Sequence, residues 1–453
     1  MNGAPVLVVL LISLGSLSIS LQHACALSPG QIPSDRGSPE SDTTIAQDQP
    51  ESPRPTQPTA QEDLARAEAF HERGRARLAS GDLTGAVTEL REALRLQPHF
   101  IHARVNLGLA LYNQGDLDGA IEEYRAALSM EPDLAQARVS LATAFMVKHE
   151  WVAARAELDE AIRLQPELVQ AHDSLGAVRY TMGDIPGAIE AYREALWLKP
   201  DYADAHYHLG LMLKLANQET DSATELLAAS QAGLPNAQYF LGTAYRSGHG
   251  VERNLTAAIT WWFRAAEQGM TQAKEALGQL RQLALLKGKH SPEESRATVE
   301  AFKDYRKGIW KEFPQLSPNG PEEGVGSSLF RQGRIQEAVP LLIREAYALS
   351  EPSQAQLETL YEQGVEGFLA PYDDRILAYF RTTASEGLPH PRLVLARIYA
   401  RGLGVSQDRT KAIALLKGNP DEEAKRLLRE LSGPAQDAGH STKGPQPRSV
   451  VTP

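Results

Sequence analysis

Small and large apolar side chains recur at fixed places along residues 67–202, with a period of 34 residues. Prolines mark the period, at Pro98, Pro132, Pro166 and Pro200. The pattern divides the region into four blocks, 67–100, 101–134, 135–168 and 169–202. In each block small residues occupy the eighth, twentieth and twenty-seventh places, and a large residue occupies the twenty-fourth. A repeat of this length predicts a stack of similar units, each packed on its neighbours.

Each block predicts two helices of about 14 residues on either side of a turn. Gly-Asp pairs mark the turns, at Gly81-Asp82, Gly115-Asp116 and Gly183-Asp184. We expect the small residues, such as Gly108, to lie where the paired helices cross, because only small side chains let two backbones approach closely. The large residue of the same block, here Tyr124, would fill the space beside the crossing. The proline then ends the second helix through its steric effect on the preceding residue.

This pattern resembles the tetratricopeptide repeat family. A fifth unit begins at Ala203 and includes Leu209-Gly210 before the pattern weakens. The resemblance implies an all-α fold, in which antiparallel helix pairs stack into a right-handed α-solenoid. We expect this tetratricopeptide solenoid to span residues 62–235.

A related pattern follows in residues 236–286. The segment from Ala237 to Tyr245 is followed by a Gly-His-Gly-Val loop at 248–251 and by an aromatic, alanine-rich segment from Ala257 to Gly269. This order looks like a Sel-one-like repeat, a relative of the tetratricopeptide repeat with a longer loop between its helices. The loop glycines allow backbone conformations with positive φ. A second copy lies 154 residues further on, from Gly387 to Ile413.

The other segments complete the expected organisation. Residues 287–318 match no repeat but have helical composition in their middle, so we expect a helical linker. Residues 319–432 carry degenerate copies of both repeats. Residues 27–61 and 433–453 are rich in polar residues and proline without apolar periodicity, which predicts a disordered linker and a disordered tail.

Residues 1–26 predict a signal peptide for export. They contain no charged side chain, and an apolar run over residues 5–21 precedes the small-x-small site Ala24-Cys25-Ala26. A run of this length is at the lower limit for spanning a bilayer, so a membrane anchor formed by residues 5–21 is the alternative. Cleavage after Ala26 would remove Cys25, the only cysteine. A mature chain without disulfides favours a periplasmic location among exported or secreted proteins.

Composition narrows the possible partners and chemistry. The formal net charge is −11, and basic residues are interleaved with acidic ones along the predicted helices, so we do not expect a nucleic acid as partner. The sequence has no phosphate-binding loop, nucleophile elbow, His-Glu-x-x-His motif or Cys-x-x-Cys pair. We therefore expect no catalytic residues, no enzyme activity and no cofactor.

Two further features admit both a functional and a structural interpretation. Among the 12 histidines, His206 and His208 are two residues apart and would point in different directions on a helix. His172 and His206 share one place in successive blocks and could stack between helices. Packing or solvated histidines are favoured over ligands, so we expect no metal site. The aromatic run Trp261-Trp262-Phe263 could recognise a ligand, but its place on a second helix favours a role in packing.

In tetratricopeptide arrays the first helix of each unit lines a concave groove, and the resemblance carries this groove over to the first helices of the blocks. The candidate protein-binding residues are His71, Arg75, His102, Val105, Asn106, Leu109, Tyr112, Gln136, Val139, Met146, Asp173, Tyr180 and Tyr207. Tyrosine and methionine side chains suit adaptable apolar contact. Gln136 and Ser140 stand where a clamp for chaperone carboxylates would need basic residues, which disfavours a chaperone tail as the ligand. The alternative is that this face is merely solvated.

The resemblance implies a non-catalytic scaffold or adaptor of the cell envelope or secretory pathway, whose groove binds a protein or peptide. The main alternative is a regulatory or substrate-presenting subunit of an envelope enzyme complex. An unrecognised enzyme site in residues 271–330 and a lectin-like or peptidoglycan-binding role also stay open. The sequence does not set the oligomeric state or name the partner.

Overall fold

The computed structural model describes residues 60–285, 291–316, 318–320 and 323–433. The expected signal peptide, and nearly all of the expected N-terminal linker and C-terminal tail, lie outside these residues. Within the described ranges every regular element is a helix, as the sequence predicts. None of these helices combines the length and apolar character that a membrane span requires. The described residues form two compact units, which divide between residues 218 and 219 and are called unit 1 and unit 2 in chain order.

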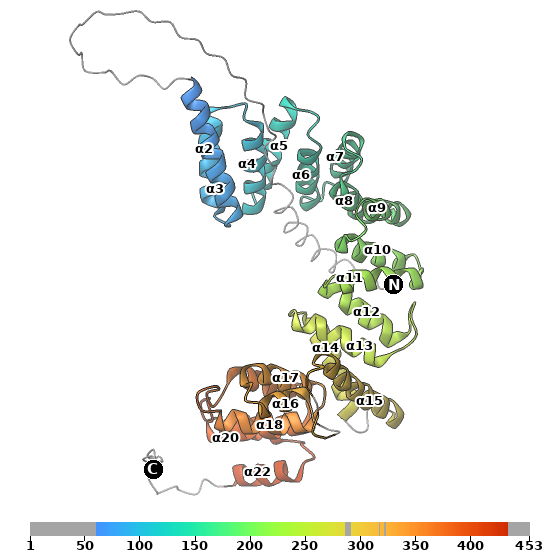
Figure 1. Ribbon diagram of the computed structural model, residues 1–453, viewed down its shortest axis with the longest axis vertical. Coiled ribbons are helices and arrows are strands. Elements are labelled where there is room, and N and C mark those ends of the chain that lie inside the picture. Colours follow the sequence, from blue (N-terminus) through green and yellow to red (C-terminus); the bar gives the residue numbers. More distant parts are fainter. Residues whose placement is uncertain (1–59, 286–290, 317, 321–322, 434–453) are drawn as a thin grey trace, which may run out of the picture. The chain divides into compact units, whose positions relative to one another are not determined.

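Unit 1 consists of consecutive helices that pack as antiparallel pairs (Figure 1). They are α2 (Ala60–Ala79), α3 (Leu83–Leu96), α4 (Ile101–Gln114), α5 (Leu117–Met130), α6 (Ala135–Val147), α7 (Trp151–Leu164), α8 (Val169–Thr181), α9 (Ile185–Leu198) and α10 (Ala203–Leu215). The first helices of successive pairs, α2, α4, α6, α8 and α10, also contact one another in order. Each pair therefore packs on its neighbours, which is the arrangement of a solenoid.

The predicted Gly-Asp turns are confirmed. Gly115 adopts φ 87°, and Asp116 caps α5 by accepting a hydrogen bond from the amide of Gly119 at 3.0 Å. The same geometry recurs at the other two Gly-Asp turns. The third turn lacks glycine, and there His149 takes the left-handed conformation with φ 61°. Left-handed backbone favours glycine, so this turn is strained, and Asn217 after α10 adopts the same conformation with φ 58°.

The predicted pairing of small and large residues is also confirmed. A Cβ atom added to Gly108 would lie 2.6 Å from a ring carbon of Tyr124, and one added to Gly176 would lie 2.6 Å from a ring carbon of Tyr192. Both tyrosines are fully buried, so their rings cannot move aside. The eighth and twenty-fourth places of a block therefore meet at the helix crossing, and the register read from the sequence is correct.

Unit 2 continues with helices of more varied length. They are α11 (Glu219–Gln231), α12 (Pro235–Ser247), α13 (Leu255–Glu267), α14 (Thr271–Leu285), α15 (Pro292–Ile309), the 3-10 helix η1 (Trp310–Glu312), α16 (Val325–Arg331), α17 (Ile335–Tyr347), α18 (Glu351–Gln363), α19 (Asp374–Ser385), α20 (Pro389–Arg401), α21 (Arg409–Leu416) and α22 (Glu422–Ser432). The pairs α12–α13, α16–α17 and α20–α21 pack most closely. The sequence places α11 with the first array, but it packs on α12 and belongs to unit 2.

The first Sel-one-like pair uses the same crossing device with a larger residue. A Cβ atom on Gly242 would lie 2.6 Å from the indole of Trp262, whose Nε1 donates a hydrogen bond to the carbonyl of Tyr239 at 3.0 Å. Trp262 and Phe263 are buried, which confirms the packing role for these two residues, whereas Trp261 stays partly exposed beneath the guanidinium group of Arg264. The loop glycines Gly248 and Gly250 both have positive φ, as expected.

Residues expected to form a helical linker provide α15, which packs against α13 and α14. Phe302 and Tyr305 on this helix are buried, and the ring of Tyr305 stacks on Phe263 with centroids 4.5 Å apart. Ser291 caps α15 by accepting a hydrogen bond from the amide of Glu294. The segment is therefore an integral part of the core of unit 2.

Candidate functional site

The predicted groove residues lie on the first helices of unit 1, and their exposure divides them into two groups. Eight of the thirteen are buried: His71, Val105, Asn106, Leu109, Val139, Met146, Asp173 and Tyr207. The other five are at least partly exposed: Arg75, His102, Tyr112, Gln136 and Tyr180. The buried group contributes to packing within unit 1, so only the exposed group offers surface to a ligand.

The buried group forms a ladder between successive first helices. Asn106 Nδ2 lies 2.8 Å from His71 Nε2, and His208 Nδ1 lies 3.1 Å from the carboxylate of Asp173. Both pairs join the fifth place of one block to the sixth place of the next, 35 residues on. Between them, Val and Ser occupy the same two places, at Val105 and Ser140 and again at Val139 and Ser174. The ladder therefore has hydrogen-bonded polar pairs at its two ends and valine–serine pairs in its middle.

The two histidines of the ladder have opposite electrostatic environments. Burial lowers the pKa of His71, so its imidazole is held neutral. Burial also opposes the charged form of His208, but the carboxylates of Asp173 and Asp204 outweigh it and raise the pKa. The rings of Tyr192 and Tyr207 pack against His208, with centroids 5.3 and 5.5 Å away. One end of the ladder therefore favours a neutral histidine and the other a cationic one.

The exposed part of the predicted groove is aromatic and polar. Burial of their rings raises the pKa values of Tyr112 and Tyr180, so both hydroxyl groups stay protonated and can donate or accept hydrogen bonds. The charge of Arg75 is paired with Glu72 at 3.0 Å. An amphipathic surface of this kind suits contact with a peptide better than binding of a small ion.

Sequence reasoning missed the role of the fourth place of each block. Arg104, Arg138, His172 and His206 occupy this place, and each makes a hydrogen bond with the carbonyl of the period proline six residues earlier. The distances are 3.0, 3.0, 2.8 and 2.9 Å. The sequence does carry a signal for this role, because all four of these residues can donate a hydrogen bond and occupy the same place in successive blocks. His172 and His206 thus tie the loops between helix pairs to the first helices.

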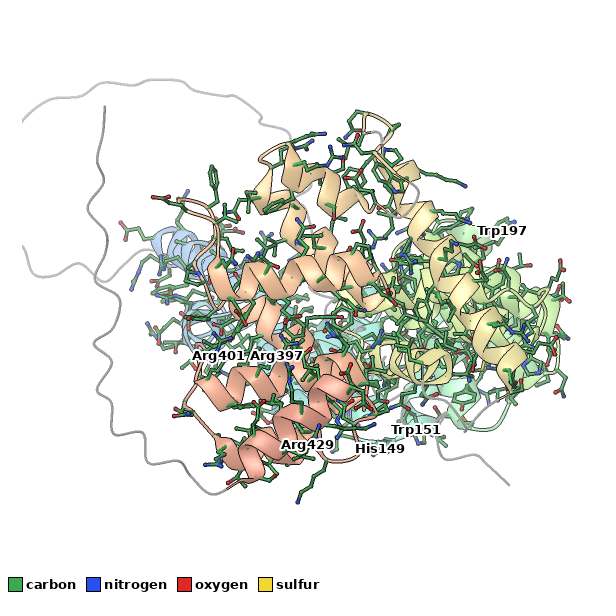
Figure 2. The ribbon with its side chains drawn as sticks, turned by 90° about the horizontal axis from the view of Figure 1, so that it is seen from below. His149, Trp151, Trp197, Arg397, Arg401 and Arg429 are labelled. Atoms are coloured by element: carbon green, nitrogen blue, oxygen red, sulfur yellow. The ribbon has the colours of Figure 1, made fainter. Side chains whose placement is uncertain are left out.

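No cluster for a metal ion is found in the described ranges, where no three His, Cys, Asp or Glu side chains gather suitably. Other prominent side chains lie outside the predicted groove (Figure 2). Trp197 on the second helix α9 is 78% exposed. In unit 2, Arg397 and Arg401 of α20 pair with Glu358 and Glu362 of α18 at 2.6 and 3.3 Å. Opposite charges are therefore interleaved on this surface.

Comparison with known families identifies the repeats. A tetratricopeptide repeat model matches residues 71–135 and 106–169, and a TPR repeat model matches residues 178–215. A Sel1 repeat model matches residues 235–270 and 393–417. These matches cover the two regions in which the sequence shows the corresponding patterns. Repeats of these two kinds generally bind protein partners, and an architecture made only of such repeats is typical of non-catalytic scaffolds.

One curated relative is the ERAD-associated E3 ubiquitin-protein ligase component HRD3A of Arabidopsis thaliana, with 29% identity over 191 residues. The match covers 41% of this chain and 27% of the plant protein. This chain therefore matches only about a quarter of the length of the plant protein.

Three solved structures are similar in part. MamA is 26% identical with a TM-score of 0.33, over 35% of this chain and 92% of MamA. The pilF protein of Pseudomonas aeruginosa is 18% identical with a TM-score of 0.42, and the match covers 48% of this chain and 99% of the pilF chain. A protective antigen with an SLR fold from uropathogenic Escherichia coli is 20% identical with a TM-score of 0.39, and the match covers 83% of this chain and 90% of the antigen. The family matches carry the identification: this chain contains tetratricopeptide repeats in unit 1, followed by Sel1 repeats in unit 2.

Proposed function

We propose that this protein is a non-catalytic scaffold of the cell envelope or secretory pathway, and that it holds a protein or peptide on the first helices of unit 1. The observation that carries the proposal is the arrangement of Tyr112 and Tyr180. They are partly exposed on α4 and α8, while their neighbours in the ladder are buried. Aromatic side chains of this kind give large contact area with little loss of conformational entropy.

The ladder supports this proposal because it fixes the helices that present the two tyrosines. The contacts His71–Asn106 and Asp173–His208 join α2 to α4 and α8 to α10. A surface that is ordered before binding loses less entropy when a ligand binds. The absence of a basic clamp at Gln136 and Ser140 favours a ligand held by apolar contact and hydrogen bonds over one held by a terminal carboxylate.

An envelope or secretory location rests on the sequence of the first 26 residues, with the apolar run over residues 5–21 as a membrane anchor in the alternative. A second candidate function is that of a regulatory or substrate-presenting subunit in an envelope enzyme complex. The similarity to HRD3A, which is named as a component of a ubiquitin ligase, favours this candidate.

Crosslinking capture tests the proposal. The tagged full chain and its Tyr112→Ala/Tyr180→Ala variant would be expressed in the native cell, crosslinked, purified and examined by mass spectrometry. Trp197→Ala, which removes an exposed aromatic residue outside the predicted groove, is the matched control. We expect a partner that the wild type and the control capture and the tyrosine variant loses. Identical partners for all three proteins would contradict the groove. An enzyme among the lost partners would favour the second candidate function.

A further inference from the structure

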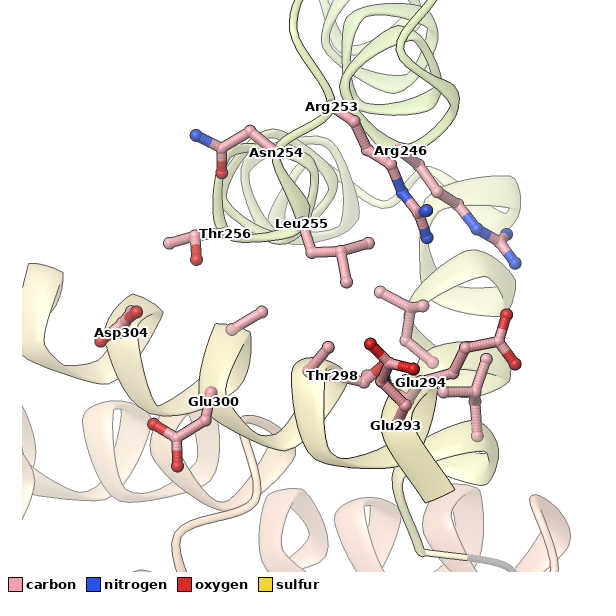
Figure 3. A pocket seen from close by; sticks show the side chains of 14 residues that line it. Arg246, Arg253, Asn254, Leu255, Thr256, Glu293, Glu294, Thr298, Glu300 and Asp304 are labelled. Atoms are coloured by element: carbon pink, nitrogen blue, oxygen red, sulfur yellow. Dashed lines mark hydrogen bonds between the residues drawn. The ribbon is translucent and has the colours of Figure 1, made fainter. Parts of the chain in front are cut away.

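A cleft with a volume of about 580 Å³ lies entirely within unit 2 (Figure 3). It is bounded by the end of α12, the start of α13 and the helices α14 and α15. Its volume is within the range of about 300–1,000 Å³ that is usual for ligand sites. The cleft is separate from the groove of unit 1, so an inference about it does not depend on the proposed function.

One edge of the cleft is cationic. Arg246 in the last turn of α12 and Arg253 just before α13 extend side by side from this edge (Figure 3). The loop between them is closed by a hydrogen bond from the amide of Asn254 to the carbonyl of Tyr245 at 2.8 Å. Asn254 also caps α13, by accepting a hydrogen bond from the amide of Ala257 at 2.9 Å. The Sel1 loop thereby holds two guanidinium groups and a helix N-terminus on the same side.

The opposite wall is acidic. Glu293, Ala297, Glu300 and Asp304 are spaced by three or four residues along α15, which puts them on one face of the helix. Glu294 lies beside Glu293 at the same end of the cleft (Figure 3). The wall is fixed in place, because the buried residues described above anchor the other face of α15 in the core.

Among the residues that the structure places, most of these charges have no ionic partner. Asp304 pairs with Lys307 at 2.8 Å. In the ranges that the structure describes, Arg246, Arg253, Glu293 and Glu300 form no ion pair. Unpaired charges of both signs therefore face one cavity and are available to a ligand.

The lining of the cleft also has apolar side chains, which include Leu255, Leu280 and Leu283. A hydrogen bond from Ser295 Oγ to the carbonyl of Leu283 at 2.8 Å ties α15 to α14. An apolar side chain of a ligand would be removed from water against these leucines, at about 25 cal/mol for each Å² buried.

We propose that this cleft binds a short segment of a partner protein that carries a lysine or arginine, an apolar residue and a carboxylate. The basic group would face the carboxylates of α15, the apolar residue would rest on the leucines, and the carboxylate would meet Arg246 and Arg253. A purely acidic segment would be repelled by four carboxylates, and a purely basic one by two guanidinium groups. Charge complementarity therefore selects a segment that has both signs.

Fluorescence anisotropy on the full chain tests this inference. The probes are fluorescein-labelled hexapeptides in which one lysine, two leucines and one aspartate are permuted among glycines. Glu293→Lys/Glu300→Lys should weaken the best binder by roughly tenfold or more, since close charge pairs across an interface are strongly coupled. The same variant should prefer the corresponding peptide in which glutamate replaces the lysine.

Glu351→Lys/Glu366→Lys is the matched control, because both residues are exposed and lie outside the cleft, and the change in net charge is the same. It should bind the original peptide as the wild type does. Equal loss in the control, unchanged binding by the Glu293/Glu300 variant, or no binding of any peptide to the wild type would overturn the inference. Thermal melting of each variant would confirm that the fold is retained.

Discussion

Units 1 and 2 are both made of helix pairs, yet the contacts that hold them differ in sequence span. In unit 1, the ladder pairs His71–Asn106 and Asp173–His208 join residues 35 positions apart. In unit 2, the guanidinium group of Arg281 on α14 bonds the carboxylate of Glu386, the residue that follows α19, 105 residues away. Unit 1 is therefore determined by neighbouring repeats, whereas unit 2 depends on contacts between distant segments. The two candidate surfaces reflect this difference.

The largest expected effect is in unit 2, at Arg281. Its side chain is 3% exposed, bonds Glu386 at 2.8 Å and lies over the ring of Tyr347. Arg281→Met should destabilise unit 2 by about 3 kcal/mol, because the partly buried carboxylate of Glu386 loses its partner. Hydrogen exchange of α14 and α19 in the full chain would measure it. Arg401→Met, at an exposed ion pair, should cost no more than about 1 kcal/mol. Equal effects would show that the long-range pair does not hold unit 2.

The next effect is in unit 1, at the helix crossing. Gly108→Leu should destabilise the second helix pair by about 1–3 kcal/mol, because the added side chain meets the buried ring of Tyr124. Faster hydrogen exchange in α4 and α5 would report it, with Gly308→Leu as the control at a helical glycine that has open space. An unchanged melting curve for the Gly108 variant would refute the repeat register.

A smaller effect distinguishes the two ends of the ladder. The raised pKa of His208 makes protonation stabilise the fold, so this contribution is present below the ordinary value of 6.5 and is lost as pH rises through the raised value. The lowered pKa of His71 has the opposite consequence, because the unfolded chain binds the proton more tightly and stability is lost as pH falls below 6.5.

Urea unfolding of His71→Gln and His208→Gln between about pH 5 and 8 would measure these slopes. The stability of the wild type relative to His71→Gln should rise with increasing pH. Its stability relative to His208→Gln should fall with increasing pH. Slopes of the same sign would contradict the assignment of the two environments.

Much of unit 1 could be predicted from the sequence, because its structure is set by places within one repeat. The turns and the crossing at Gly108 follow from local spacing in unit 1, and the core role of Trp262 in unit 2 follows in the same way. The exposure of the groove residues could not be predicted in the same way. Val139 and Met146 are buried by neighbouring repeats, while Tyr112 stays partly exposed, and this depends on how the first helices pack.

The cleft of unit 2 could not be predicted at all. Arg246 and Glu300 are far apart in sequence and meet across one cavity only because α15 packs on α13 and α14. No repeat covers α15, so periodicity gives no register for its acidic face. The left-handed conformation of His149 in the third turn could not be predicted either, because the three Gly-Asp turns have glycine at this place.

The proposed contact between the first helices of unit 1 and a protein partner can be tested by site-specific photocrosslinking. A photoreactive phenylalanine analogue would replace Tyr112, Tyr180 or Trp197 in the full chain, and the cells would be irradiated. We expect one common partner adduct from positions 112 and 180, and none of that partner from position 197 on α9. No adduct from 112 and 180, or the same adducts from all three positions, would contradict it.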